Sequence, residues 1–344
     1  MRVFHSPTQL AHAPSMEFSR GEAIPHRESL VRVESILTAL ETAGFPVPEC
    51  PADHGLDPLT RVHATDYVDF LRTAWGLWAS NKGNDDAPAY PTAWPVPGVG
   101  HRKPQSIEAL LGWYNFDSGT PIAQGTWDAV KASAMVALSA AMAVQGGEQV
   151  AYALCRPPGH HAAAALMGGY CYLNNAAIAA QSFRDHGADR VAVIDVDYHH
   201  GNGTQALFYD RSDVFFGSLH ADPSFGFPYF MGYADEIGQG DGEGTTLNLP
   251  LPEGTGETTW MAALNHLLKR VQAFGADAIV VSLGVDTWEG DPLSSFLLPA
   301  TAFPRIGGRL ASLNLPTAII QEGGYATAEL GQNVVAVLNG FEGA

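Results

Sequence analysis

The chain has 344 residues, 46% of them hydrophobic, which is enough for a large buried core in one or two domains. Its formal net charge of −18 disfavours nucleic acid and anionic membranes as partners and favours small cations. No stretch approaches the roughly 18 uninterrupted apolar residues of a membrane span. Three cysteines, Cys50, Cys155 and Cys171, form no C-x-x-C pair, which indicates a reducing compartment, and we expect the cytoplasm.

Short apolar runs alternate with helix-like segments along the chain. This alternation predicts an α/β fold with a parallel sheet that helices cover on both faces. No repeat and no linker interrupts it, so we expect a single domain over residues 1–344. The predicted strands are residues 1–4, 150–154, 191–194, 214–219, 278–285 and 317–320. One predicted helix follows Thr126, its expected N-cap, and stops at Gly146-Gly147. The other predicted helices are about residues 174–186, 257–274, 303–313 and 329–338.

Residues 80–105 depart from this rhythm, because they hold five prolines together with Tyr90 and Trp94. A loop of this length in a compact domain is usually functional or disordered. The aromatic residues argue against disorder. We expect this Pro/Gly-rich insertion to be a lid or a contact between the subunits of a homodimer.

Polar residues directly follow the strand predicted at 191–194. Asp195, Asp197 and His199 alternate along the chain, so they point to one side where the strand ends. Burying such groups is costly unless a partner satisfies them. A divalent metal is the simplest partner. The alternative is a capped strand end that carries histidines on the surface.

Three further polar motifs also come after predicted strands. They are residues 156–161 (RPPGHH), Asp286 and residues 322–325 (EGGY). In open α/β sheets, ligands bind beyond the carboxyl ends of the strands. Together the motifs predict one site at this edge of the sheet.

The chemistry of these side chains suggests a division of roles. Asp197, His199 and Asp286 offer two carboxylates and one imidazole, which leave a coordination position open, as catalytic zinc sites do. His160 and His161 suit general acid–base catalysis, because imidazole titrates near neutrality.

Two more residues suit supporting roles. Asp195 lies outside the ligand set and can orient a histidine. Tyr325 follows two glycines, which let its hydroxyl project toward the metal and stabilise an oxyanion. The alternative for Tyr325 is a packed loop aromatic.

Five motifs together resemble the histone deacetylase family of zinc amidohydrolases. The chain length and the insertion at 80–105 are most similar to the bacterial acetylpolyamine amidohydrolases within it. The resemblance runs from about Val62 to Tyr325. The motifs are RPPGHH (156–161), GGYCYLNN (168–175), DVDYHHGNGT (195–204), GVDT (284–287) and EGGY (322–325).

The resemblance implies an eight-stranded parallel sheet of the arginase–deacetylase type. It implies Zn²⁺ or Fe²⁺ on the three ligands above, with the two histidines as an acid–base pair. His160 would pair with Asp195 and His161 with Asn202. Some relatives carry an aspartate in the latter position, so the charge on His161 is less supported here.

The same resemblance implies a substrate tunnel and a structural ion. Gly169 would contribute a carbonyl to the tunnel, and Tyr170 and Phe227 would form its walls. The residues around a structural K⁺ would be Asp195, Asp197, His199, Ser218 and Leu219.

The polyamine-specific relatives also have an acidic pair near the tunnel mouth. Glu108 matches one member, whereas the other position holds Gly119, and Asp117 lies two residues away. We expect Glu108 and Asp117 to attract the second amine of a cationic substrate. The alternative is that both are ordinary solvated charges.

We therefore expect an enzyme that removes acetyl groups from small cationic amines, such as acetylputrescine or acetylcadaverine. A protein acetyl-lysine deacetylase is the nearest alternative and would need a wide mouth. An arginase-like ureohydrolase needs two metals, but Gly201 and Gly284 stand where extra carboxylates would be required. A metal-binding scaffold without turnover would predict the loss of His160, His161 or Tyr325, and all three are present.

Overall fold

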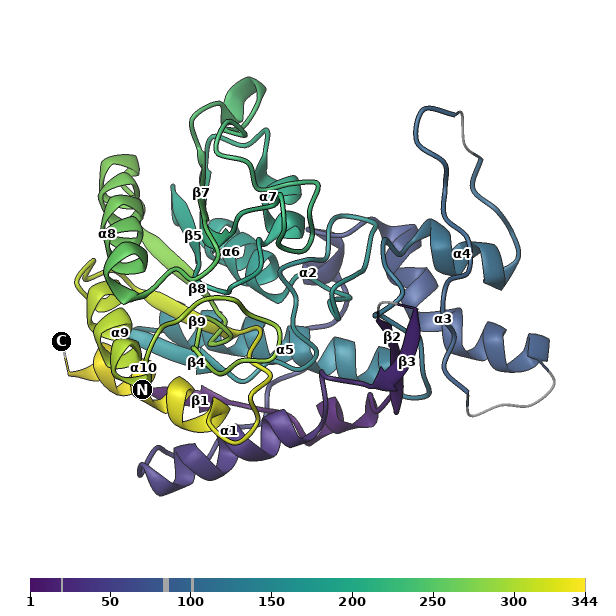
Figure 1. The fold of residues 1–344 in the computed structure, drawn as a ribbon, viewed down its shortest axis with the longest axis horizontal. Coiled ribbons are helices and arrows are strands. Elements are labelled where there is room, and N and C mark those ends of the chain that lie inside the picture. Colours follow the sequence, from purple (N-terminus) through teal and green to yellow (C-terminus); the bar gives the residue numbers. More distant parts are fainter. Residues whose placement is uncertain (20, 83–86, 100–101, 344) are drawn as a thin grey trace.

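A seven-stranded, all-parallel sheet forms the centre of the computed structural model, which describes residues 1–19, 21–82, 87–99 and 102–343 (Figure 1). The strands are β1 (Arg2–Phe4), β2 (Met16–Ser19), β3 (Glu22–Pro25), β4 (Val150–Ala153), β5 (Val191–Asp195), β6 (Val214–Ala221), β7 (Thr246–Leu251), β8 (Ala278–Leu283) and β9 (Thr317–Gln321). The sheet order is β1-β4-β9-β8-β5-β6-β7, while β2 and β3 form a separate antiparallel hairpin. The predicted α/β class with a parallel sheet is confirmed.

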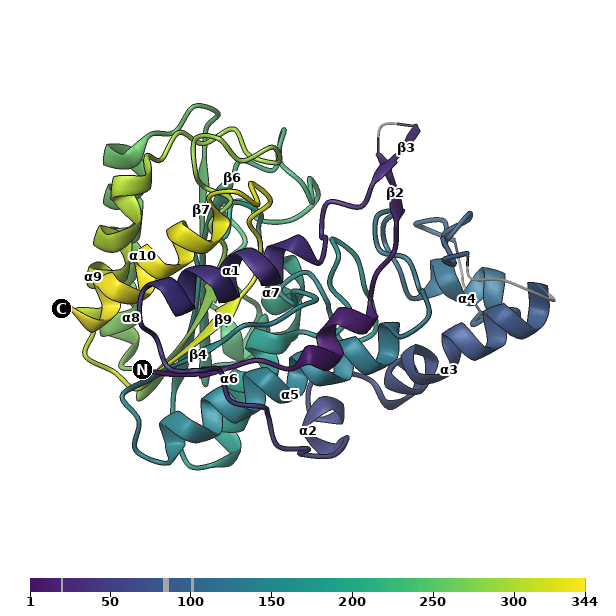
Figure 2. The same ribbon diagram turned by 90° about the horizontal axis from the view of Figure 1, so that it is seen from below.

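Helices cover both faces of this sheet (Figures 1 and 2). The helices are α1 (Val31–Thr42), α2 (Asp57–Thr60), α3 (Thr65–Lys82), α4 (Ile107–Trp113), α5 (Thr126–Gln145), α6 (Asn175–Asp185), α7 (Asn202–Phe208), α8 (Glu257–Phe274), α9 (Phe303–Ala311) and α10 (Leu330–Glu342). Within the described residues, short 3₁₀ helices lie at Pro7–Ala11, Gly240–Gly242 and Ala300–Ala302.

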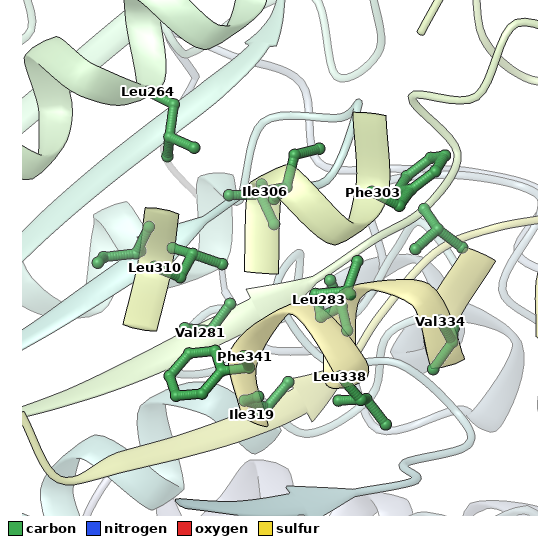
Figure 3. Close-up of a cluster of buried hydrophobic side chains, with 14 of the residues drawn as sticks. Leu264, Val281, Leu283, Phe303, Ile306, Leu310, Ile319, Val334, Leu338 and Phe341 are labelled. Atoms are coloured by element: carbon green, nitrogen blue, oxygen red, sulfur yellow. The ribbon is translucent and has the colours of Figure 1, made fainter. Parts of the chain in front are cut away.

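The central strands are apolar on both sides because each side contacts a layer of helices. Along β5, Ala192 and Ile194 join the core beneath α8, α9 and α10, whereas Val191 and Val193 join the core beneath α5 and α6. Figure 3 shows part of the first core, where side chains of α8, α9 and α10 pack on β8 and β9. Burial on both faces explains why these strands are continuous apolar runs.

The sheet has one strand fewer than the eight that the family resemblance implies. Beside the edge strand β1, Glu49 forms a single parallel bridge with Phe4, and its backbone bonds to Val3 and His5. The prolines at 46 and 48 have no N–H to donate, so the pairing does not extend into a strand. The eighth strand is therefore reduced to this bridge in the described part of the chain.

Helices α3 and α4 form an arm that extends away from the sheet (Figures 1 and 2). Its own apolar cluster includes Tyr67 and Leu111 and packs against α5. The predicted insertion at 80–105 lies at this arm, and its residues 83–86 and 100–101 are outside the described residues. Among the others, Val96 and Val99 are exposed.

Helix α5 is long and apolar enough to cross a membrane by length and composition alone. Most of it is buried inside the protein, as in a core helix.

Candidate active site

The loops after β4, β5, β8 and β9 converge at the carboxyl edge of the sheet, where three side chains that could hold a metal ion meet. The Nδ1 of His199 lies 3.1 Å from Oδ1 of Asp197 and 3.0 Å from Oδ2 of Asp286. Asp197 and Asp286 are fully buried. Because Asp197 and His199 follow β5 and Asp286 follows the adjacent β8, the parallel register of these strands sets the spacing of the group.

Two glycines keep a cradle open beside these side chains. A Cβ at Gly284 would lie 2.0 Å from Oδ2 of Asp197, and a Cβ at Gly323 would lie 2.6 Å from Oδ2 of both Asp197 and Asp286. Any larger residue would fill this space. Two carboxylates and an imidazole, with ligand atoms all within 4.8 Å of one another, fit a divalent metal ion.

Backbone N–H groups orient both carboxylates. The N–H of Gly323 donates to Oδ2 of Asp197 at 2.8 Å, and the N–H of Tyr198 donates to Oδ1 of Asp286 at 2.9 Å. Burial and the charge of Asp197 raise the pKa of Asp286 to about 7. A bound divalent cation would relieve this repulsion between two buried carboxylates, which is a second reason that the group fits a metal.

The extra carboxylate ligands of a second, arginase-type metal ion would not fit at Gly201 or Gly284. A Cβ at Gly201 would lie 2.1 Å from Oδ2 of Asp195, and one at Gly284 would collide with Asp197. A carboxylate side chain at either glycine would displace a residue of the present site.

The two histidines of the RPPGHH motif have different partners. The Nδ1 of His160 lies 3.0 Å from Oδ2 of Asp195, whereas the Nδ1 of His161 lies 2.7 Å from Oδ1 of Asn202. Burial alone would lower the pKa of His160, but Asp195 and Asp197 outweigh it and raise the pKa to about 10. Burial and the charge of His160 keep the pKa of His161 well below its usual value. The pair therefore combines a protonated and a neutral imidazole.

The turn that carries Tyr325 is fixed by residues that the sequence analysis did not identify. Oδ2 of Asp291 accepts hydrogen bonds from the backbone N–H of Tyr325 at 2.7 Å and of Ala326 at 3.0 Å. The guanidinium of Arg32 lies 5.0 Å from the centre of the Tyr325 ring and donates to the carbonyl of Gly324. Burial raises the pKa of Tyr325 well above its usual value, so its hydroxyl stays protonated and can donate.

Arg32 also belongs to a buried ion network. It pairs with Glu28 at 2.7 Å, and Arg156 pairs with the same carboxylate at 2.9 Å. Arg156 begins the RPPGHH motif, and Arg32 contacts the EGGY turn. The network therefore ties two loops of the site to the start of α1.

Aromatic side chains surround the histidines. The ring of Phe227 stacks on Phe116, with centroids 5.9 Å apart, and is perpendicular to the ring of His161, with centroids 5.1 Å apart. The ring of Tyr170 lies 5.8 Å from that of Tyr325. Phe116 comes from the loop after α4, and its role is visible only in the folded chain.

The GG turn before Tyr170 allows this close packing. A Cβ at Gly168 would lie 2.3 Å from the Phe116 ring, and one at Gly169 would lie 2.2 Å from the His161 ring. Gly169 and Tyr170 both have positive φ, at 56° and 65°. The turn thus requires glycine beside His161, and it orients Tyr170 toward the site.

Two carboxylates contact this turn. Oδ2 of Asp117 accepts the backbone N–H of Gly169 at 2.5 Å, and Oδ1 accepts that of Gly119 at 3.0 Å. Oε1 of Glu17, a buried residue of β2, accepts the hydroxyl of Tyr170 at 3.0 Å. Asp117 therefore braces the GG turn with Oδ2 and its own loop with Oδ1. Glu17, which sequence reasoning missed, is a further acid beside Tyr170.

Glu108 belongs to the projecting arm of this chain. It is exposed in the first turn of α4, on the projecting arm, and accepts a hydrogen bond from Asn81. Among the described residues, no hydrogen bond or ion pair joins it to Asp117.

The residues expected around K⁺ lie at the ends of two adjacent strands. Asp195 is paired in register with Ser218 across β5 and β6, and Leu219 follows Ser218. Asp197 and His199 follow Asp195 in the loop. The Oγ of Ser218 lies 2.8 Å from Nδ1 of His220.

Comparison with known proteins agrees with this geometry. A family model described as "Histone deacetylase domain" matches residues 26–341. "Acetylpolyamine amidohydrolase 2" of Pseudomonas aeruginosa is 47% identical over 343 residues, which cover 100% of this chain and 99% of the relative. "Acetylpolyamine amidohydrolase" of Mycoplana ramosa is 46% identical over 345 residues, covering 100% of both chains.

A solved structure gives the same result in three dimensions. The crystal structure of acetylpolyamine aminohydrolase from Burkholderia pseudomallei superposes with a TM-score of 0.93 at 40% identity. The match covers 99% of this chain and 98% of that one. The chain therefore belongs to the histone deacetylase family.

Proposed function

We propose that the protein is a divalent-metal-dependent amidohydrolase that removes the acetyl group from N-acetylated polyamines and similar small amines. The observation that carries this proposal is the 46–47% identity, over nearly the full length of both chains, to enzymes named acetylpolyamine amidohydrolases. The contacts of the site support the same chemistry.

The proposed metal ligands are Asp197, His199 and Asp286. A divalent ion held there would supply Lewis-acid polarisation of an amide carbonyl and would activate a water molecule as nucleophile. We propose Zn²⁺ as this ion, with Fe²⁺ as the alternative. The two carboxylates are already held in place by backbone N–H groups, so the ligand set needs little reorganisation to bind.

The two histidines divide the proton transfers. The Nδ1–H of His161 donates to the Asn202 oxygen, which leaves Nε2 free to accept a proton from the attacking water. His160 is held as an imidazolium by Asp195 and can give a proton to the departing amine. After each turnover, His160 returns to its protonated form with the proton that His161 has taken up.

Tyr325 would donate its hydroxyl proton, in a hydrogen bond, to the oxygen that gains negative charge as the amide carbonyl is attacked. The hydrogen bonds that Asp291 and Arg32 make to the backbone of the Tyr325 turn keep this hydroxyl in position. Phe227, Phe116 and Tyr170 would line a narrow tunnel and exclude bulk water, which strengthens these polar interactions.

Several further properties belong to the same proposal. We propose one deacetylase domain, a homodimer in which the insertion at 80–105 makes contacts, and a cytoplasmic location. Exposed Trp94, Val96 and Val99 in the insertion support the contact. The three free cysteines support a reducing compartment. We also propose a structural K⁺ at the ends of β5 and β6.

The test measures acetate release from three substrates: N-acetylputrescine, N-acetylcadaverine and an acetyl-lysine peptide. The metal-loaded protein should release acetate from the acetylated diamines, and the chelated protein should not. A protein acetyl-lysine deacetylase would instead prefer the peptide. No acetate from any substrate would reject the proposed function.

A further inference from the structure

A second group of metal-binding side chains lies beside the site described above. One ring nitrogen of His160, the Sγ of Cys171 and one carboxylate oxygen of Glu322 all lie within 4.8 Å of one another. All three residues are at least 97% buried. They share no member with the aspartate–histidine–aspartate group.

Glu322 has a carboxylate oxygen that the protein leaves unsatisfied. Its Oε2 accepts the backbone N–H groups of Gly159 at 2.7 Å and His160 at 3.1 Å. Its Oε1 is buried and has no hydrogen-bond partner among the described residues. A buried charged oxygen without a partner is costly, so this atom requires a proton or a cation. In keeping with that cost, burial raises the pKa of Glu322 to about 7.

We propose that His160, Cys171 and Glu322 form a second, inhibitory transition-metal site that takes a thiophilic divalent cation, such as excess Zn²⁺ or Cd²⁺. Thiolate, imidazole and carboxylate are the ligand types that zinc binds, and the sulfur favours the softer metals. A tetrahedral ion with bonds of about 2.0–2.3 Å holds its ligands about 3.3–3.8 Å apart. Side-chain shifts of about 1 Å therefore close the site.

Binding at this site exchanges protons for the metal. The Cys171 thiol, which now donates to the carbonyl of Gly169 at 3.3 Å, releases its proton to solvent and becomes a thiolate ligand. His160 likewise gives up a proton to free a ring nitrogen. No bond to carbon changes, and no oxidation occurs.

The inhibitory consequence rests on the proposed function, because it is the acid–base role of His160 that a metal ligand would remove. The binding itself does not depend on that function. It also has its own signature, since the sulfur of Cys171 distinguishes this site from the aspartate–histidine–aspartate group, which has only oxygen and nitrogen ligands.

Cadmium absorbance tests the binding directly. The full-length, zinc-loaded protein is titrated with Cd²⁺ while the ultraviolet thiolate-to-cadmium charge-transfer absorption is recorded. Because Cys50 is exposed, the titration uses the Cys50→Ser background. We expect one Cd²⁺ per chain to produce the band, and Cys171→Ser to abolish it. Glu322→Gln should weaken the binding at least about 10-fold.

Cys155→Ser is the matched control, because Cys155 is a second buried thiol and donates to the carbonyl of Ser133 instead. It should keep the band. Circular dichroism identifies any variant that fails to fold, and Cys171→Ala then replaces Cys171→Ser. A band that persists without Cys171, or the absence of a band in the Cys50→Ser protein, would overturn the proposal.

Activity provides the second readout. Excess Zn²⁺ should inhibit the Cys50→Ser enzyme, and Cys171→Ser should resist the inhibition. Equal inhibition of both proteins would overturn the inhibitory assignment. If the metal-loaded protein hydrolyses no acetylated amine, the proposed function fails, while the cadmium titration still decides whether the site exists.

Discussion

Each histidine of the proposed acid–base pair has one ring nitrogen bound to a different kind of partner. His160 faces the carboxylate of Asp195, whereas His161 faces the neutral amide of Asn202. A carboxylate partner stabilises an imidazolium, and an amide partner does not. Asp195 and Asp197 raise the pKa of His160, whereas burial and the charge of His160 lower that of His161, so the two adjacent imidazoles have opposite protonation states.

The difference predicts that the two histidines are not equivalent in catalysis. His161→Ala removes the neutral imidazole that accepts the proton of the attacking water, and it should lower kcat by about 10²–10⁴-fold. His160→Ala should cost less, because solvent can protonate an amine as it departs. Steady-state kinetics with acetylputrescine compare the two variants. Equal losses, or a greater loss for His160→Ala, would contradict this assignment.

Tyr325 permits a test that removes a single oxygen. Tyr325→Phe should leave the fold and the metal content intact, since its backbone contacts with Asp291 do not involve the hydroxyl. Turnover should fall by about 10²–10³-fold, the usual scale for an oxyanion donor. The measurement is kcat together with metal analysis. Turnover near the wild-type value would show that the hydroxyl is not the oxyanion partner.

At the scale of elements, the strands that carry the site were the most predictable part of the chain. β5 and β9 each differ from their predicted ranges by a single residue at the carboxyl end. Helix α8 matches its prediction of residues 257–274, because Gly256 and Gly275 mark both ends. Apolar runs buried on both faces give a strong signal, and the chemistry-bearing loops come directly after them.

Elements that depend on tertiary packing were not predicted. β7 contains Pro250, which argues against a strand in the sequence, but β7 lies at the edge of the sheet, where proline is tolerated. Glu17 and Phe116 come from the hairpin and the loop after α4, far in sequence from the catalytic motifs. Nothing local marks them, because only the packing of the arm and hairpin against Tyr170 and Phe227 brings them to the site.

His63 links the segment between α2 and α3 to the turns before α6, and this link predicts a pH dependence. Its Nδ1–H donates to the carbonyl of Ala163 at 2.9 Å, and its Nε2 accepts the N–H of Asn174 at 2.9 Å. Protonation of Nε2 would place its N–H directly against the backbone N–H of Asn174. Burial lowers the pKa of His63 to about 4.

His63 binds a proton near pH 6.5 in the unfolded chain but only near pH 4 in the folded chain. The contribution of neutral His63 to the free energy of unfolding is therefore complete above pH 6.5 and is lost as the pH falls. Between pH 6.5 and 5 the loss is about 2 kcal/mol. Urea unfolding at both pH values should show a smaller loss for His63→Gln than for the wild type. Identical losses would refute the assignment to His63.

For the whole molecule, the site geometry predicts one tightly bound catalytic metal per chain. Gly201 and Gly284 leave no space for the carboxylates of a second catalytic ion. Elemental analysis after dialysis should therefore give about one transition metal per chain, and His199→Ala should lose metal and activity together. Two tightly retained metals per chain that both support turnover would contradict a mononuclear centre. The proposed inhibitory site is distinguished from this centre by its dependence on Cys171.

Net charge and the arm together determine which substrates the molecule should prefer. With 36 acidic and 18 basic residues, the surface attracts cations, and Glu108 adds an exposed carboxylate on the arm. If the arm packs against a second copy of the chain, it would narrow the entrance of the proposed substrate tunnel, so that only thin substrates enter. The same packing would bring Glu108 near that entrance. An exposed pair of this kind contributes about 1 kcal/mol.

Glu108→Ala should therefore lower kcat/KM for acetylated diamines about 3–5-fold while leaving a neutral acetamide of equal length nearly unchanged. Asp57→Ala is the matched control, because Asp57 is also an exposed acid in the first turn of a short helix, and it should affect neither substrate. The wild type should also prefer short acetylated diamines to acetyl-lysine peptides, because a narrow mouth admits a thin chain more easily than a polypeptide backbone. If Glu108→Ala affects both small substrates equally, the carboxylate acts on the structure of the arm and not on the charge of the substrate.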